Sequence, residues 1–128
     1  MAKKSKRAKL LKRLDDLCRD ITRLICKDLC QRCGKYVTGS NAHTCHVVAK
    51  GNGASKRRFD LLNLFLGCMY CHRWWHNHPT ESGKWFAKKW PHREKYLEKY
   101  RYGKPAPITD TEMEEKIVEY KQKKRDLT

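Results

Sequence analysis

The sequence predicts a small α+β fold, with a short β-hairpin and a helix at its centre and further helices on both sides. Two Cys-x-x-Cys pairs, at residues 30–33 and 68–71, enclose a stretch of short β-prone runs. Apolar residues recur at helical spacing before and after this stretch. We therefore divide the chain into a basic arm with an N-terminal helix (residues 1–29), a central core (30–80) and C-terminal helices with a basic tail (81–128).

The four paired cysteines predict a metal site that stabilises the core. Apolar residues make up 39% of the 128 residues and charged residues 34%, so the hydrophobic core must be small and a bound metal would add stability. A tetrahedral zinc ion takes two ligands from each of two facing knuckles, and the candidates are Cys30, Cys33, Cys68 and Cys71. A secreted disulfide framework is the alternative. Seven cysteines are an odd number and no signal-peptide pattern opens the chain, so we expect a reducing cytoplasm.

The first segment combines a basic arm with an amphipathic helix. Residues 1–9 are rich in Lys and Arg, which suits either a solvated arm or one that contacts phosphate. A helix of about four to five turns is then predicted by apolar residues at alternating spacings of four and three: Leu10, Leu14, Leu17, Ile21 and Leu24. This face can pack on its own chain or pair with a second copy. Because so small a domain offers little surface to cover it, we expect a homodimer through this helix.

The central segment places histidines around the expected hairpin. Residues 42–48, which include His43 and His46, form a β-prone run that a glycine-rich loop follows. A further run, at residues 58–64, completes the expected hairpin and leads to the second cysteine pair. The helix expected from that pair carries His72 and His76 one turn apart on one face.

Three helices are predicted in the last segment. Pro79 interrupts the central helix, and Pro91 restarts a helix that Gly103 ends. We expect the aromatic residues at helical spacing here to form core and not stacking platforms for bases. Thr109 and Glu112 have the spacing of a capping box that starts the final helix.

The charge of the chain points to a polyanionic partner. The 30 Lys and Arg against 14 Asp and Glu give a formal charge of +16, for which nucleic acid is the leading partner. A merely soluble basic protein and a surface for anionic lipid are the alternatives, but no apolar run approaches bilayer length, and we expect no membrane association. Within the core we expect DNA contacts from the basic residues Lys50, Lys56, Arg57, Arg58 and Arg73.

The core resembles the HNH nucleases, whose fold is also named ββα-metal or His-Me finger. The likeness covers roughly residues 30–80 and is carried by the two cysteine pairs, Cys45-His46-Val47-Val48 with its glycine-rich loop, Arg58-Phe59-Asp60 with Asn63, and Cys68-Met69-Tyr70-Cys71-His72. It is nearest to the phage recombination endonucleases of the NinG (Rap) type and looser to phage endonuclease VII, a Holliday junction resolvase. The resemblance implies a ββα-metal core and, for a phage-encoded chain, the host cytoplasm.

The resemblance also implies roles for three residues. His46 stands where these families keep the general base, and His72 where they keep the helix residue that binds a divalent ion. Asn63 matches the middle asparagine, which braces the loop around the base through backbone hydrogen bonds. An imidazole suits the base because its pKa lies near neutrality. The four cysteines match the structural zinc of the family.

The ligands of the catalytic ion are where this chain departs from the family. Many members have Asp immediately before the base, where this chain has Cys45, and NinG-type proteins tend to have an acid three positions before it, where this chain has His43. We expect Mg²⁺ or Mn²⁺ in addition to the structural Zn²⁺, with a softer transition ion as the alternative that these ligands favour. We rank His72 first as ligand, His76 second, His43 third and Cys45 last, because Cys45 can equally be a packing residue.

These features lead to one leading hypothesis and two alternatives. The leading one is a metal-dependent DNA endonuclease that hydrolyses phosphodiester bonds of branched recombination intermediates such as Holliday junctions. Two active sites related by a two-fold axis could then cut opposed strands. A non-catalytic zinc-ribbon module would bind nucleic acid by charge without cutting it. An HNH homing or restriction-type nuclease would make discrete cuts in linear DNA.

Overall fold

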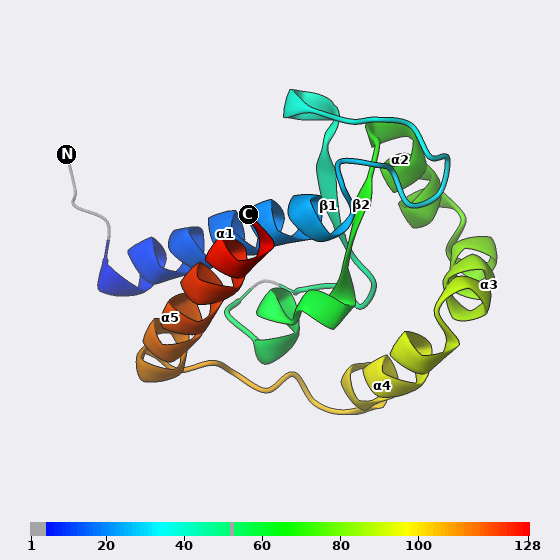
Figure 1. Cartoon of the computed structure of the whole chain (residues 1–128). Helices are drawn as coiled ribbons and strands as arrows, with labels where there is room; N and C mark the ends of the chain where they lie inside the picture. The colour runs from blue at the N-terminus through cyan, green and yellow to red at the C-terminus, as the bar shows by residue number, and fades with distance from the viewer. Residues whose placement is uncertain (1–4, 52) are drawn as a thin grey trace.

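The computed structural model describes residues 5–51 and 53–128, and this part of the chain is a mixture of helices and a two-stranded antiparallel sheet. The helices are α1 (Lys6–Ile25), α2 (Met69–Asn77), α3 (Pro79–Lys89), α4 (Pro91–Tyr102) and α5 (Asp110–Leu127), and the strands are β1 (His43–His46) and β2 (Leu64–Gly67). Short 3₁₀ turns lie at η1 (Gly39–Asn41), η2 (Lys56–Phe59) and η3 (Leu61–Asn63). The prediction of a mixed α and β fold is confirmed. Figure 1 shows α1 and α5 on one side of the hairpin and α2, α3 and α4 along the other.

The helix boundaries follow from capping residues. α1 begins at Lys6, before the apolar repeat, because the side chain of Ser5 accepts a hydrogen bond from the backbone N–H of Ala8 at 3.1 Å. The second half of the expected basic arm is therefore helix, and residues 1–4 lie outside the described residues. The capping box of Thr109 and Glu112 at the start of α5 is confirmed. Proline stands at the first position of both α3 and α4, as expected.

The apolar face of α1 is covered by α5. The two helices pack together in a cluster that also takes in residues from the turns between them: Leu14, Leu17, Cys18, Ile21, Phe59, Leu64, Ile108, Met113, Ile117 and Tyr120. Figure 1 shows the two helices side by side, although they stand at opposite ends of the sequence. The homodimer stays a prediction, but the reason for it no longer holds, because the chain itself covers the face expected to pair.

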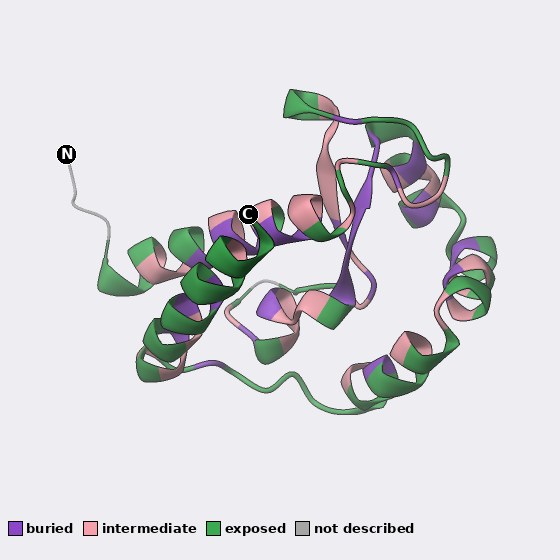
Figure 2. Cartoon of the chain, viewed as in Figure 1, coloured by how far each residue is buried: buried purple, intermediate pink, exposed green. Residues whose placement is uncertain are grey.

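Strand β2 connects three separate clusters of buried side chains. In the antiparallel pairing, His43 lies opposite Gly67 and His46 lies opposite Leu64. Leu64 packs with α1 and α5, Phe65 packs with the aromatic residues of α2 and α3, and Leu66 packs beside the cysteine pairs. Every residue of β2 is buried, as Figure 2 shows. The hairpin is thus the element that fixes α1 and α5, the C-terminal helices and the cysteine pairs relative to one another.

Aromatic residues fill the space between the hairpin and the C-terminal helices. The ring of Phe65 lies between 5.1 and 6.4 Å, centre to centre, from the rings of Trp75, Trp85, Phe86 and Trp90. Trp75 and Phe86 are buried, and Trp85 and Trp90 are partly buried. The expectation that the aromatics of the last segment form core is confirmed for Trp85, Phe86 and Trp90, whereas Tyr96 of α4 is exposed. None of the described helices combines the length and the apolar character that a membrane crossing requires.

Candidate functional site

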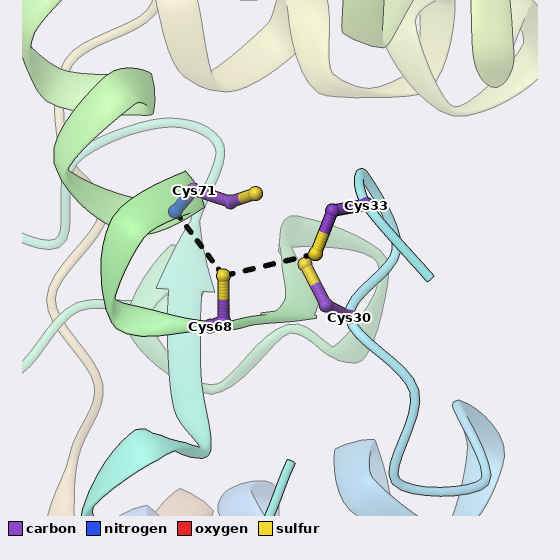
Figure 3. Close-up of side chains that lie close together, drawn as sticks. All are labelled: Cys30, Cys33, Cys68 and Cys71. Carbon is purple, nitrogen blue, oxygen red and sulfur yellow. Dashed lines mark hydrogen bonds between the residues drawn. The ribbon is translucent and has the colours of Figure 1, made fainter. Parts of the chain in front are cut away.

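The four paired cysteines meet at one point and can hold a metal ion. Their Sγ atoms all lie within 4.8 Å of one another, and this is the one group of three or more possible ligands found so close together in the described part of the chain. Figure 3 shows Cys30 and Cys33 facing Cys68 and Cys71. Two sulfur atoms bound to tetrahedral zinc at about 2.3 Å lie about 3.8 Å apart. The Sγ atoms of Cys33 and Cys68 are 3.9 Å apart, so the geometry fits zinc.

Short backbone contacts shape the two knuckles. Gly34 takes a positive φ of 78° directly after Cys33, and its N–H donates to the carbonyl of Cys30 at 2.9 Å. The N–H of Gln31 donates to the carbonyl of Leu66 at 2.9 Å, which ties the first knuckle to β2. The second knuckle is the first turn of α2, where Cys68 is the N-cap residue. The cysteines are therefore positioned by the hairpin and by the start of a helix.

The charges around the cysteines suit a bound cation. Burial opposes a charged thiolate at Cys30, yet backbone N–H groups of the knuckles stabilise it and lower its pKa to about 6. Burial raises the pKa of Cys71 to about 12, partly offset by the guanidinium of Arg32, whose NH1 lies 3.5 Å from the Cys71 Sγ. Four thiolates this close repel one another, and a bound cation or protonation of the thiols removes that repulsion. The cluster is therefore suited to a metal and not to four free thiolates.

A second candidate site is a cavity of about 620 Å³ between the hairpin, α2, α3 and α4. Its lining side chains include the predicted base His46 and the predicted ligands His72 and His76. The Nε2 atom of His46 lies 3.1 Å from the carbonyl oxygen of Arg58. Because a carbonyl can only accept, Nε2 carries the proton and Nδ1 of the neutral ring is an acceptor. Burial lowers the pKa of His46, which favours this neutral form.

Asn63 makes the backbone contacts that the resemblance implied. Its side chain is fully buried, its Oδ1 accepts from the N–H of Val48 at 2.8 Å, and its Nδ2 donates to the carbonyls of Val48 at 2.9 Å and Arg57 at 3.0 Å. These bonds join the segment that follows β1 to η2. They connect the beginning and the end of the loop that follows His46.

The three histidines proposed as metal ligands form a chain and do not converge on one point. His43 donates from Nε2 to the carbonyl of Ser40 at 2.9 Å, so its Nδ1 is an acceptor, and this atom lies 2.9 Å from Nδ1 of His72. His72 then carries its proton on Nδ1 and has a lone pair on Nε2, which lies 3.1 Å from Nε2 of His76. In this arrangement His43 orients the ring of His72 by accepting from its Nδ1–H, as hydrogen-bond partners of metal-binding histidines do.

His72 and His76 fit a borderline transition ion better than a hard cation. Two imidazole nitrogens bound to a tetrahedral ion at about 2.0–2.1 Å lie about 3.3 Å apart, close to the spacing of their Nε2 atoms. Burial, with the neighbouring histidines, lowers the pKa of His72 to about 4, so the ring is neutral at pH 7. The described side chains that line the cavity include no carboxylate, the ligand that Mg²⁺ prefers.

Cys45 is a packing residue in this structure. Its side chain is fully buried within the aromatic cluster, and it does not line the cavity. Burial, together with the neighbouring cysteines, raises its pKa, so the thiol stays neutral. Its place at the end of the ligand ranking agrees with this geometry.

The basic residues expected to contact DNA differ in their surroundings. Arg58 forms a two-pronged ion pair with Asp15 of α1, at 3.1 and 2.6 Å, and its side chain is only 16% exposed. Lys56 lies 3.5 Å from a carboxylate oxygen of Glu112, and Arg57 donates to the carbonyl of Tyr100. Arg73 is exposed on α2, and Lys50 lines the cavity.

One basic residue of the cavity, Arg101 of α4, was not among the candidates from the sequence. It lies outside every motif, and no local pattern in the sequence distinguishes it from the other basic residues of its helix.

Comparisons with protein-family models, with curated proteins and with solved structures find no match.

Proposed function

We propose that this protein is a metal-dependent DNA endonuclease of the HNH type, built on a ββα-metal core with a structural zinc ion. The observation that carries the proposal is the orientation of His46. Its Nε2 donates to the Arg58 carbonyl, and its unprotonated Nδ1 belongs to a ring that lines the same cavity as His72. A zinc-ribbon module that only binds nucleic acid has no use for a histidine held this way.

The geometry supports hydrolysis by an activated water. A phosphodiester is cleaved when water attacks in line and loses a proton as charge builds on the leaving oxygen. Nδ1 of His46 accepts that proton, while the Arg58 carbonyl keeps the proton on Nε2 in place. Asn63 holds the loop that carries His46. A divalent ion bound by His72 and His76 would stabilise the charge on the leaving oxygen.

Branched recombination intermediates are the substrate we propose. This part depends on the resemblance to NinG-type endonucleases and on two active sites cutting opposed strands. Because α5 covers the apolar face of α1, two copies would have to pair through another surface or assemble on the DNA. The excess of positive charge supports a nucleic acid of either shape.

A cleavage assay tests the proposal. The zinc-loaded protein is incubated with a labelled four-way junction or a linear duplex in Mg²⁺, Mn²⁺, added Zn²⁺ or EDTA. We expect metal-dependent cutting of the junction, with Mn²⁺ or Zn²⁺ more effective than Mg²⁺. His46→Ala should lower the rate by about 10²–10⁴-fold and leave DNA binding intact. His92→Ala, which removes an exposed histidine of α4, is the control and should cut normally.

Other outcomes would favour the alternatives. Binding to both DNA shapes without cutting in any metal would favour a zinc-ribbon module. Discrete cuts in the linear duplex, independent of branching, would favour a homing or restriction-type nuclease. Equal cutting by the wild type and His46→Ala would show that His46 is not the base.

A further inference from the structure

The histidine cavity has a second, cationic side. Besides its histidines, its lining includes Lys50 from the loop after β1 and Arg101 from the last turn of α4. With no carboxylate among its described lining residues, the cavity is positively charged. The surrounding sequence has the same bias, because residues 29–104 hold fifteen of the 30 Lys and Arg but only four of the 14 Asp and Glu.

Arg101 is held in place by its own helix. Its NH2 lies 2.9 Å from Oε2 of Glu94, and its side chain is 29% exposed. A guanidinium has five N–H donors in a planar fork, so this one contact among the described residues leaves other N–H groups that can face the cavity. Glu94 does not line the cavity, so it orients the guanidinium from outside.

A third cation lies behind the loop that carries Lys50. Arg57 donates to the carbonyl of Tyr100 at 3.5 Å. The NH2 atom of Arg57 also lies beside Gly51, 3.5 Å from the position that a Cβ would take on this glycine. The Nε atom of Arg57 is buried and has no hydrogen-bond partner among the residues that the structure describes. The loop at residues 50–51 and the end of α4 are therefore brought together around positive charge.

We propose that Lys50 and Arg101 form an anion subsite that binds a phosphate group of the DNA backbone next to His46. The N–H donors of Arg101 match phosphate oxygens in pairs, and Lys50 adds a point charge from the loop after β1. The C-terminal helices, which carry no nuclease motif, thereby contribute to substrate binding. The identification of the anion as DNA depends on the proposed function, whereas phosphate binding itself does not require cleavage.

Titration of the zinc-loaded protein with inorganic phosphate tests the subsite directly. At constant ionic strength, NMR should show shifts of the Gly51 amide and the Arg101 side chain that chloride does not produce. We expect Arg101→Gln to weaken phosphate binding about 10-fold or more, because it removes a charge-assisted hydrogen-bond donor. Arg101→Lys should keep part of the affinity, and Lys50→Gln should also weaken it. Lys95→Gln removes an exposed charge of α4 that does not line the cavity, and it should leave the phosphate affinity unchanged.

Cleavage kinetics separate this inference from the proposed nuclease. Arg101→Gln should raise KM for DNA about 10-fold and change kcat less than His46→Ala does. Equal phosphate affinity and equal KM in the wild type and Arg101→Gln would overturn the subsite even if the protein cuts DNA. Phosphate binding that depends on Arg101 in a protein that cuts nothing would uphold the subsite and overturn the nuclease.

Discussion

His46 donates a hydrogen bond from Nε2 to the carbonyl oxygen of Arg58 at 3.1 Å, and this bond determines which imidazole nitrogen can act as a base. The carbonyl belongs to η2, whose neighbouring carbonyls also have side-chain partners. The Arg57 carbonyl accepts from Asn63 at 3.0 Å. The Phe59 carbonyl accepts from the hydroxyl of Tyr120 in α5 at 2.5 Å. The proposed base is thus oriented by a segment that the N- and C-terminal parts of the chain hold in position.

The pH dependence of cleavage should reflect the environment of His46. Burial lowers its pKa below the ordinary value of 6.5, and the charges of Lys50 and Arg58 act in the same direction. The hydrogen bond to the Arg58 carbonyl and the charge of Asp15 act against them. A general base is active when neutral, so kcat/KM should rise with pH through this lowered pKa and level off above it. We expect the acidic limb to be centred below pH 6.5, measured with DNA binding followed at each pH. An acidic limb centred above pH 6.5 would contradict the assignment.

Removal of the Asn63 side chain should destabilise the protein strongly. Asn63→Ala leaves one N–H and two carbonyls without partners in a fully buried site, and we expect a loss of about 3–5 kcal/mol in the free energy of unfolding. Asn63→Asp should also destabilise, because a carboxylate cannot donate to the two carbonyls. Denaturant unfolding measures both, with the exposed Asn77→Ala at the end of α2 as the control, expected within about 0.5 kcal/mol of wild type. A loss below 1 kcal/mol in Asn63→Ala would show that the loop does not depend on this residue.

The features predicted from the sequence are those set by neighbouring residues. The spacing of each cysteine pair, the helical spacing of His72 and His76, and the capping box of α5 depend on only a few consecutive residues. They could therefore be predicted without knowledge of the tertiary fold, and the structure contains each of them.

The features that the sequence did not predict depend on contacts between distant segments. Whether the apolar face of α1 is free or covered depends on where α5 packs, and no pattern in either helix states it. His43 has the same side chain as the ligands proposed beside it, and only its bond to Ser40 shows that it orients His72. Arg101 is separated from the histidines in sequence and reaches their cavity only through the packing of α4.

Zinc binding should stabilise the centre of the chain through the four cysteines. We expect one zinc ion per chain by elemental analysis, and a fall in Tm of roughly 10 °C or more when a strong chelator removes it, because metal binding contributes directly to folding. Cys68→Ser should lose the ion and show the same fall without chelator. Cys26→Ser, which changes a cysteine outside the cluster, should keep one ion per chain. Unchanged zinc content and Tm in Cys68→Ser would rule out this site.

The ion pair between Asp15 and Arg58 should affect catalysis from α1. Its two contacts fix the residue whose carbonyl holds His46, so Asp15→Asn should lower kcat about 3- to 10-fold while costing only about 1–2 kcal/mol of stability. Asp15 also raises the pKa of His46, so its neutralisation should move the acidic limb of the pH profile to lower pH.

Controls on the same helix and at the partner residue make this test specific. Asp16→Asn removes a neighbouring charge of α1 that pairs with Lys12 at 3.4 Å on the surface, and it should change neither kcat nor the pH profile. Arg58→Lys keeps the charge but loses the two-pronged geometry, and it should lower kcat as Asp15→Asn does. The double variant of Asp15→Asn and Arg58→Lys should be no worse than the poorer single variant if the two residues act as a pair. Losses that add in the double variant, or a pH profile that does not move in Asp15→Asn, would mean that the pair stabilises the fold without positioning His46.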